Sequence, residues 1–182
     1  HHNAQDIASL AGLLARLVAM TTEPERPGLM QRWSEFAAAA RACEARGERE
    51  RATRLIDRAL ERLHDGPDHD KLLLLQARLL RRRGRDEAAV DIWRGMMGLP
   101  LHRSLPAWIE AAKHEEHVRR DHEAARALVW RALRQVELEE ELRVLLNRPT
   151  APLAPRLLED LHGRAARLAR KLARASPATG PR

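Results

Sequence analysis

Three stretches of the sequence follow one pattern: Gly47-Glu-Arg-Glu-Arg-Ala52, Gly84-Arg-Asp-Glu-Ala-Ala89 and Arg120-Asp-His-Glu-Ala-Ala125. They begin 37 and then 36 residues apart, slightly more than the 34 residues of a tetratricopeptide repeat. In each, a turn is followed by acidic residues and alanines that suit the start of a helix. The recurrence therefore predicts helical hairpins that repeat along the chain, although the third stretch has no glycine at its turn.

Small side chains recur in register with this pattern. They lie in the first helix of each pair (Ala40, Ala77 and Ala112) and in the second (Ala52, Ala89 and Ala125, then Ala59, Met96 and Ala132). Two antiparallel helices approach closely where such residues face each other, and larger ones (Ile56, Trp93 and Val129) fill the gap to the next pair. We therefore expect an all-α fold over residues 29–146, a right-handed, tetratricopeptide-like array of antiparallel helix hairpins; a plain helical bundle is the alternative.

The composition excludes several classes of protein. The chain has 182 residues, 44% of them hydrophobic, with no Tyr and a single Phe, and such a composition favours helices over sheets. The longest apolar run, Leu10 to Met20, is broken by Arg16 and is too short for the roughly 20 residues of a membrane span. One cysteine, Cys43, cannot form an internal disulfide, so we expect a cytoplasmic protein that is not in a membrane.

Hydrophobic periodicity predicts the helix boundaries. We expect helices over residues 6–20, 29–45, 48–63, 70–84, 86–97, 104–120 and 121–133, a short helical piece to 146, and a basic C-terminal helix over 156–175. The first helix carries an apolar stripe (Ile7, Leu10, Leu13, Leu14, Leu17 and Val18). A proline-rich linker over 147–155 and a frayed tail over 176–182 complete the prediction.

Basic residues predominate, with a formal net charge of +7 and a pI of about 10.9. Nearly all are arginines, so the excess indicates either contact with nucleic acid or the codon composition of a GC-rich genome. Four of them (Arg81, Arg82, Arg83 and Arg85) lie at the C-terminal end of a predicted helix. Cations there oppose the negative end of the helix dipole, so the cluster is either a solvated cap or a site for phosphate.

A second basic row lies on the C-terminal helix (Arg164, Arg167, Arg170 and Lys171), with leucines on the other side. Such a helix can bind along DNA, lie on an acidic membrane surface or cap the array. No aromatic residues are interleaved, so we expect contact with the phosphate backbone and a steep dependence on salt.

Two segments carry a family resemblance. The first is Ala111-Ala-Lys-His-Glu-Glu-His-Val-Arg-Arg-Asp-His-Glu-Ala-Ala-Arg-Ala-Leu-Val-Trp-Arg-Ala-Leu133, and the second is Leu161-His-Gly-Arg-Ala-Ala-Arg-Leu-Ala-Arg-Lys171. Together they resemble the C-terminal, tetratricopeptide-like region of bacterial RNase H-like exonucleases of the YprB type. In the first segment His114 and His122 stand where that family has aromatic residues, and Glu116, His117 and Asp121 match its pattern.

The N-terminal stretch His2-Asn3-Ala4-Gln5-Asp6-Ile7-Ala8-Ser9-Leu10 is similar to the last motif of the nuclease domain in the same family. The resemblance implies that residues 1–20 end an upstream DEDD-type nuclease domain. It makes Asp6 the last of four carboxylates that hold two divalent cations (Mg or Mn), and His2 a catalytic residue near the nucleophilic water. Alternatively, the histidines are the remnant of a tag and Asp6 is a helix N-cap.

The resemblance implies that this chain is the C-terminal accessory region of a metal-dependent 3′→5′ DNA exonuclease in DNA repair. We expect it to bind nucleic acid or a protein partner such as a helicase, and to be inactive alone, because three carboxylates would precede it. A free-standing protein–protein adaptor without a nuclease role is the alternative. Neither His114 and His117, three residues apart, nor the lone Cys43 is expected to form a metal or catalytic site.

Overall fold

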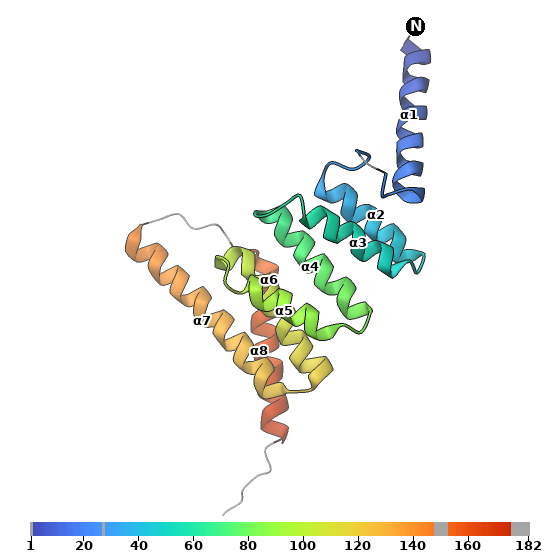
Figure 1. Cartoon of the computed structure of the whole chain (residues 1–182). Coiled ribbons are helices and arrows are strands. Elements are labelled where there is room, and N and C mark those ends of the chain that lie inside the picture. The colour runs from blue at the N-terminus through green and yellow to red at the C-terminus, as the bar shows by residue number, and fades with distance from the viewer. Residues whose placement is uncertain (1, 27, 148–152, 176–182) are drawn as a thin grey trace, which may run out of the picture. The chain divides into compact units, whose positions relative to one another are not determined.

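The computed structural model describes residues 2–26, 28–147 and 153–175, and this part of the chain is helical with no strand. The all-α prediction is therefore confirmed. In order, the helices are α1 (His2–Thr22), α2 (Trp33–Ala45), α3 (Arg49–Leu60), α4 (Pro67–Arg82), α5 (Asp86–Met96), α6 (Leu101–His114), the π-helical η1 (Glu115–Arg119), α7 (His122–Leu146) and α8 (Pro155–Ala175). The chain divides into two compact units, His1–Ala89 and Val90–Arg182 (Figure 1).

Helices α2, α3 and α4 pack against one another in the first unit (Figure 1). Their core is small and apolar, and its members include Phe36, Ala40, Cys43, Ala52, Leu55, Ile56 and Leu72. The close approach of α2 and α3 follows from Ala40 and Ala52, which are fully buried. The thiol of Cys43 is buried in this core, and burial raises its pKa.

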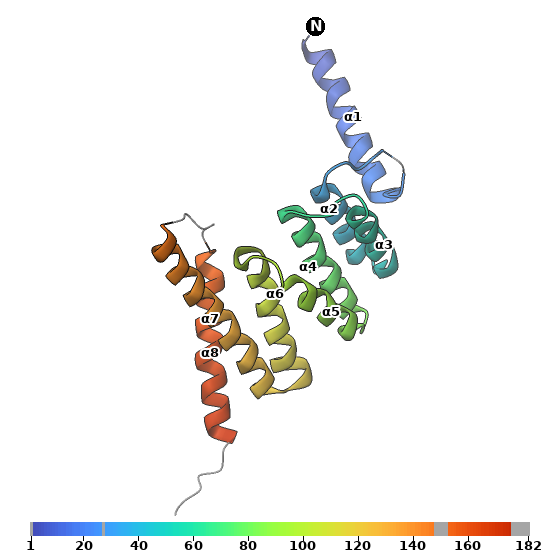
Figure 2. The same cartoon turned by 60° about the vertical axis from the view of Figure 1, so that its left-hand side comes forward.

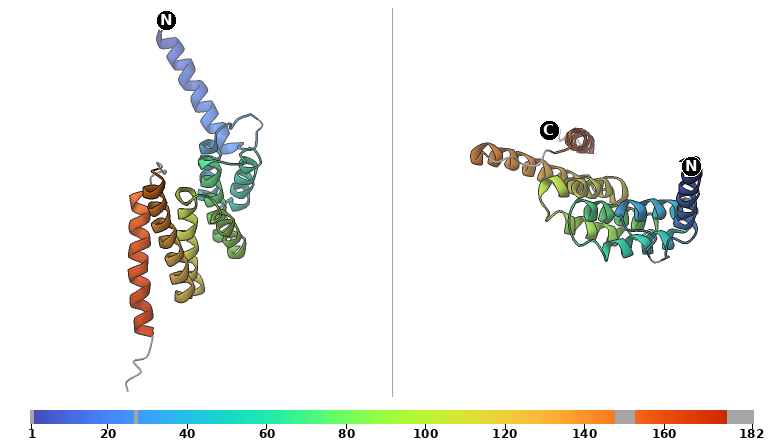
Figure 3. Two further views of the ribbon diagram at one scale, coloured as in Figure 1. Left: turned by 90° about the vertical axis from the view of Figure 1, so that its left-hand side faces the viewer. Right: turned by 90° about the horizontal axis from the view of Figure 1, so that it is seen from above.

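In the second unit α7 packs on α6, and α8 packs on both (Figure 3, left). The core contains Leu105, Ile109, Ala112, Ala125, Val129, Ala132, Leu161 and Leu168. Leu161 and Leu168 are fully buried, so α8 is an integral part of this unit. Burying these two leucines contributes roughly 3–6 kcal/mol of hydrophobic free energy.

Each of the three repeated stretches begins with a residue in the left-handed conformation. Gly47 has φ 81°, Gly84 has φ 71° and Arg120 has φ 57°, all in the left-handed region. The amide of Glu48 bonds to the carbonyl of Cys43, and Arg85 bonds to Leu80 in the same way, both at 2.9 Å. This arrangement ends a helix with a left-handed residue. The third turn also has a left-handed residue, without glycine, but it follows the π-helical η1 and closes with a bond from the Asp121 amide to the Glu115 carbonyl, six residues earlier, at 2.9 Å.

The residues predicted from that register to fill the core are buried. The set of twelve (Ala40, Ala52, Ile56, Ala59, Ala77, Ala89, Trp93, Met96, Ala112, Ala125, Val129 and Ala132) is at most 2% exposed. The periodicity therefore identified the packing positions correctly.

Several helix boundaries differ from the prediction. Helix α4 begins at Pro67 and not at Asp70, because Gly66 (φ 101°) lets proline take the first helical position, where its missing N–H costs no bond. Helix α6 begins at Leu101, three residues before Ser104. Helix α7 is one continuous helix to Leu146, because the Glu- and Leu-rich stretch after Leu133 contains no helix breaker. Most of the predicted linker (148–152) and the predicted tail (176–182) lie outside the described residues.

Helix α1 begins at His2, four residues before Asp6, and its apolar stripe is exposed. The six stripe residues are 51–66% exposed: Ile7, Leu10, Leu13, Leu14, Leu17 and Val18. The N-terminal part of α1 extends away from the rest of its unit, as Figures 1 and 2 show, and Arg16, farther along α1, pairs with Glu35 of α2 at 3.0 Å. The prediction of an amphipathic helix is correct, but the apolar side is not packed within the first unit.

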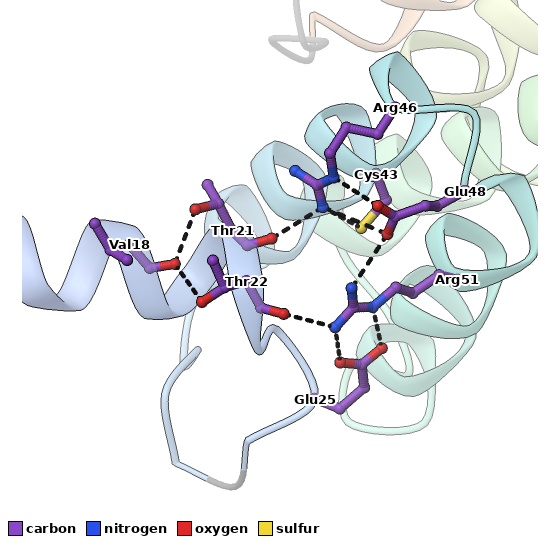
Figure 4. A network of polar contacts seen from close by, with 8 residues as sticks. All are labelled: Val18, Thr21, Thr22, Glu25, Cys43, Arg46, Glu48 and Arg51. Carbon is purple, nitrogen blue, oxygen red and sulfur yellow. Dashed lines mark hydrogen bonds and ion pairs between the residues drawn. The ribbon is translucent and has the colours of Figure 1, made fainter.

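Polar contacts hold the end of α1 to the turn between α2 and α3 (Figure 4). Arg46 donates to the Thr21 carbonyl at 2.9 Å, and Arg51 donates to the Thr22 carbonyl at 2.9 Å. Arg51 also pairs with Glu25 and Glu48, at 2.6 and 3.1 Å. The hydrogen bonds from Arg46 and Arg51 lower the pKa of Glu48 to about 2. This network holds the C-terminal end of α1 in place without burying the apolar side chains of the helix.

Within the described residues, no helix has an apolar stretch long enough to cross a membrane.

Candidate nucleic-acid interface

A buried carboxylate, Glu116, organises the basic side of α8. It lies in η1, directly after α6, where the helix widens into a π turn before Arg120 reverses the chain. A π turn holds one more residue than an α turn and changes the direction of the following side chains. His114 is 1% exposed and Glu116 is 2% exposed, so both are buried. In a regular α-helix, two residues with this spacing would lie on opposite sides. The widened turn thus places the Glu116 carboxylate in the interior.

Three cations of α8 donate to this carboxylate. Arg164 Nη1 lies 2.6 Å from Glu116 Oε2, while Arg167 Nε and Lys171 Nζ lie 3.1 and 2.8 Å from Oε1. The Nε2 atom of His117 is 3.6 Å from Oε2. The spacing of three, four and seven residues puts the three basic side chains on one side of α8, so that they converge on one carboxylate.

The electrostatics follow from this geometry. Burial alone would raise the pKa of Glu116, but the hydrogen bonds from Arg167 and Lys171, together with the charges of Arg167 and His117, lower it to about 2. The carboxylate is therefore ionised throughout the physiological range. Arg164 is also buried, and it donates a second bond to Asp160 at 3.2 Å. A buried charge without a partner destabilises the folded state. Glu116 and these cations are therefore stabilising only when they are present together.

The predicted basic row of α8 therefore divides into three kinds of residue: buried, paired and free. Arg164 is 4% exposed and faces the core, so its guanidinium is not available at the surface. Arg167 and Lys171 bind Glu116 and keep 40% and 39% of their side chains exposed. Arg170 is exposed and makes no ion pair within residues 2–26, 28–147 and 153–175. Of the four, Arg170 is the one best placed for an external phosphate.

The arginine cluster at the end of α4 divides in a similar way. Arg82 pairs with Glu44, Arg83 with Glu50 at 3.4 Å, and Arg81 Nε lies 3.6 Å from Asp86. These pairs link the end of α4 to α2, α3 and α5 within the first unit. Arg85 is exposed, and among the described residues no carboxylate pairs with it. Most of the cluster thus has a structural role, which the sequence pattern alone did not reveal.

The N-terminal candidates, His2 and Asp6, lie on α1. Asp6 is exposed inside the helix and is not its N-cap. Across the part of the chain that the structure describes, no group of three His, Cys, Asp or Glu side chains is positioned to hold a metal ion. One carboxylate cannot hold two divalent cations, so Asp6 alone would not form the site that the resemblance implies.

His114, in the segment 111–133, is a buried aromatic ring. Its ring packs against Trp93 with the centroids 6.0 Å apart and the planes tilted by 58°. It is 1% exposed and serves as a packing residue. Asp121, also in that segment, caps α7 by accepting a bond from the Ala124 amide at 2.8 Å. His117 is exposed beside Glu116 and makes no contact typical of a metal ligand.

Sequence reasoning missed two features of this unit. It did not assign Glu116 as the partner of the α8 cations, because Glu116 is one of several carboxylates in its hairpin and the sequence does not show which of them is buried. It also assigned no role to Trp130, which is 61% exposed on α7. The signal for Trp130 is its place in the repeat, where the equivalent residues Asp57 and Arg94 are charged.

Comparison of the chain with protein-family models, with curated proteins and with solved structures finds no significant match.

Proposed function

We propose that this chain is the C-terminal helical accessory region of a metal-dependent 3′→5′ DNA exonuclease of the DEDD class, a cytoplasmic enzyme of DNA repair. In this proposal the hairpins form a right-handed, tetratricopeptide-like array that binds DNA and docks a partner such as a helicase. The observation that carries the proposal is the contact between Glu116 and the cations of α8. These residues belong to the two segments that resemble the family, and they bind each other within one unit, around the buried Glu116.

The exposed side of α1 supports the position of this region after a nuclease domain. Six apolar side chains in one stripe, each more than half exposed, form a surface that soluble proteins usually cover. In the proposal the preceding nuclease domain covers it, and Asp6 completes the four carboxylates. The divalent cations (Mg or Mn) would then be held mainly by residues of that domain.

Contact with nucleic acid is supported by the net charge of +7 and by one exposed cation in each predicted basic cluster, Arg85 and Arg170, that has no carboxylate partner among the described residues. Such side chains bind phosphate without first breaking an internal ion pair. The contact is to the backbone and independent of sequence, so it positions DNA without selecting a base sequence.

The nuclease part is tested on a protein extended upstream of His1 in its own reading frame. We expect the added residues to include an Asp-x-Glu strand, and the extended protein to remove nucleotides from DNA 3′ ends with Mg²⁺ or Mn²⁺. Asp6→Asn should abolish hydrolysis and leave thermal unfolding unchanged, while the chain studied here should not hydrolyse DNA. Full activity of the Asp6→Asn protein would refute the role of Asp6.

The DNA-binding part is tested on this chain with fluorescently labelled DNA. We expect the double variant Arg85→Gln/Arg170→Gln to weaken binding. The matched control is Arg94→Gln together with Arg143→Gln, which removes the same charge from arginines that already have carboxylate partners (Asp91 and Glu140, both at 2.8 Å). Equal losses in the two double variants would show that net charge alone governs the binding.

A second candidate function, a protein–protein adaptor, is favoured by the end of α7. Leu138, Leu142 and Leu145 recur at helical spacing there and are 40%, 44% and 78% exposed. Capture of a protein segment by this side of α7, with no measurable binding to DNA, would support the adaptor over the accessory region.

A further inference from the structure

Trp130 is a large aromatic residue on the surface of α7 with no structural partner. Its side chain is 61% exposed, while its neighbour Val129 is fully buried. Within the described ranges it makes no hydrogen bond and no ring contact, and no cation stacks on its indole. More than half of the residue is therefore available to a ligand.

The repeat register shows that this side of α7 is open where an earlier repeat is covered. The residues equivalent to Arg126 and Trp130 in the first repeat are Thr53 and Asp57. Thr53 accepts a bond from Arg83 at 3.2 Å, and Asp57 accepts one from Gln76 of α4 at 2.6 Å. At α7 the equivalent side chains are exposed, so α8 does not cover them as α4 covers α3.

Two arginines flank Trp130 along this open side of α7, and a third, Arg131, follows it in the sequence. Arg126 and Arg134 lie one helical turn before and after Trp130, so the row spans about 12 Å of the helix axis. Arg126 pairs with Glu123 at 2.6 Å and Arg134 with Glu137 at 3.3 Å, each partner being farther from Trp130 along the helix. Arg131 is exposed and pairs with no carboxylate of the described residues. Exposed pairs of this kind are weak, so phosphate can replace the carboxylates.

We propose that Trp130, with Arg126, Arg131 and Arg134, forms a binding site for single-stranded nucleic acid. The indole stacks on an unpaired base, and the guanidinium groups bind the phosphates on either side. An aromatic platform within a cationic surface is the arrangement that holds single strands without sequence preference. A base inside a duplex does not offer its face, so the site distinguishes single strands from duplex. This inference rests on the proposed contact with nucleic acid and names the form that is bound.

The test measures the affinity of this chain for a fluorescently labelled oligo-dT and for a labelled duplex of the same length at low salt. We expect Trp130→Ala to weaken single-strand binding by about 5- to 100-fold and Trp130→Phe to retain most of it, because a phenyl ring also stacks. Duplex binding should change little in either variant. Because Trp130 is exposed, neither variant should impair folding, which thermal unfolding will verify.

Charge variants complete the design. Arg131→Gln should make the dependence of affinity on salt shallower, by about one phosphate contact. The matched control is Arg94→Gln, since Arg94 stands at the position equivalent to Trp130 in the second repeat and pairs with Asp91 as Arg126 pairs with Glu123. Arg94→Gln should leave single-strand affinity within about two-fold.

The outcomes separate this inference from the proposed function. Duplex binding without any effect of Trp130→Ala on single strands would overturn the Trp130 site and leave the DNA-binding proposal intact. No binding of either DNA at low salt would overturn both. Capture of a protein through Trp130 without single-strand binding would replace the inference with a docking surface.

Discussion

Arg164 Nη1 lies 2.6 Å from Glu116 Oε2, and both side chains are almost completely buried although they are 48 residues apart in the sequence. The pair joins the π turn after α6 to α8 in the second unit. We expect Glu116→Ala to destabilise this unit by about 3–5 kcal/mol, because it leaves the buried guanidinium without its carboxylate. Urea unfolding followed by circular dichroism measures the loss.

A double variant separates the pair from general damage to the core. Glu116→Gln/Arg164→Met removes the buried charge together with its partner, so its loss should be clearly smaller than that of Glu116→Ala. If the double variant is less stable than Glu116→Gln and also less stable than Arg164→Met, the two residues are not partners.

The stability of the second unit should depend on pH through Glu116. Its pKa is lowered from the ordinary 4.5 to about 2, so the folded state favours the ionised form. The stabilisation is therefore fully present above pH 4.5, declines as the pH falls, and is lost below about pH 2. It amounts to about 3 kcal/mol. Unfolding free energies of the wild type and of Glu116→Gln between pH 2 and 7 should converge at the acid end; a constant difference would refute the prediction.

At the three left-handed turns, replacing a glycine and introducing one should change the free energy of unfolding in opposite directions. Gly47→Ala and Gly84→Ala should each cost about 1 kcal/mol, because a side chain is strained at φ 81° and 71° while nothing lies within 4 Å of the new Cβ. Arg120→Gly should stabilise by up to about 1 kcal/mol, since glycine relieves φ 57° at a position with an exposed side chain. Thermal unfolding detects both effects. If Arg120→Gly is destabilising, the three turns are not equivalent.

The exposed stripe of α1 should contribute little to the stability of the first unit. Leu14→Glu changes a side chain that is 63% exposed, so we expect less than about 0.5 kcal/mol of change in the unfolding free energy. The control Leu55→Ala, at a position 1% exposed, should cost about 2–5 kcal/mol. A cost for Leu14→Glu as large as that of the control would mean that this side of α1 is packed within the chain.

Periodic features were predictable from the sequence, and single contacts between distant segments were not. The recurrence of Ala52, Ala89 and Ala125 identified the packing positions, because helix pairs accept only small residues at their closest approach. Turn glycines likewise marked the ends of α2 and α4. Helix starts were less predictable. Pro67 is the first residue of α4, and this start depends on the conformation of Gly66, which takes φ 101°.

The candidate site could be predicted only in part. The basic row of α8 was evident, but its division into buried, paired and free cations depends on Glu116, 48 to 55 residues away. The π turn that directs this carboxylate inward has no simple sequence signature. Residue type alone does not show whether Trp130 lies in the core or on the surface. The register of the repeat, and not the hydrophobicity of the side chain, places Trp130 on the surface.

The most direct test of the account is the affinity of this chain for DNA as the salt concentration rises from about 50 to about 200 mM. If about three phosphates are bound, affinity should fall by roughly 40-fold over this range. Absence of binding at 50 mM, or an affinity that does not change with salt, would contradict the claim that the exposed arginines of this helical protein contact the nucleic-acid backbone.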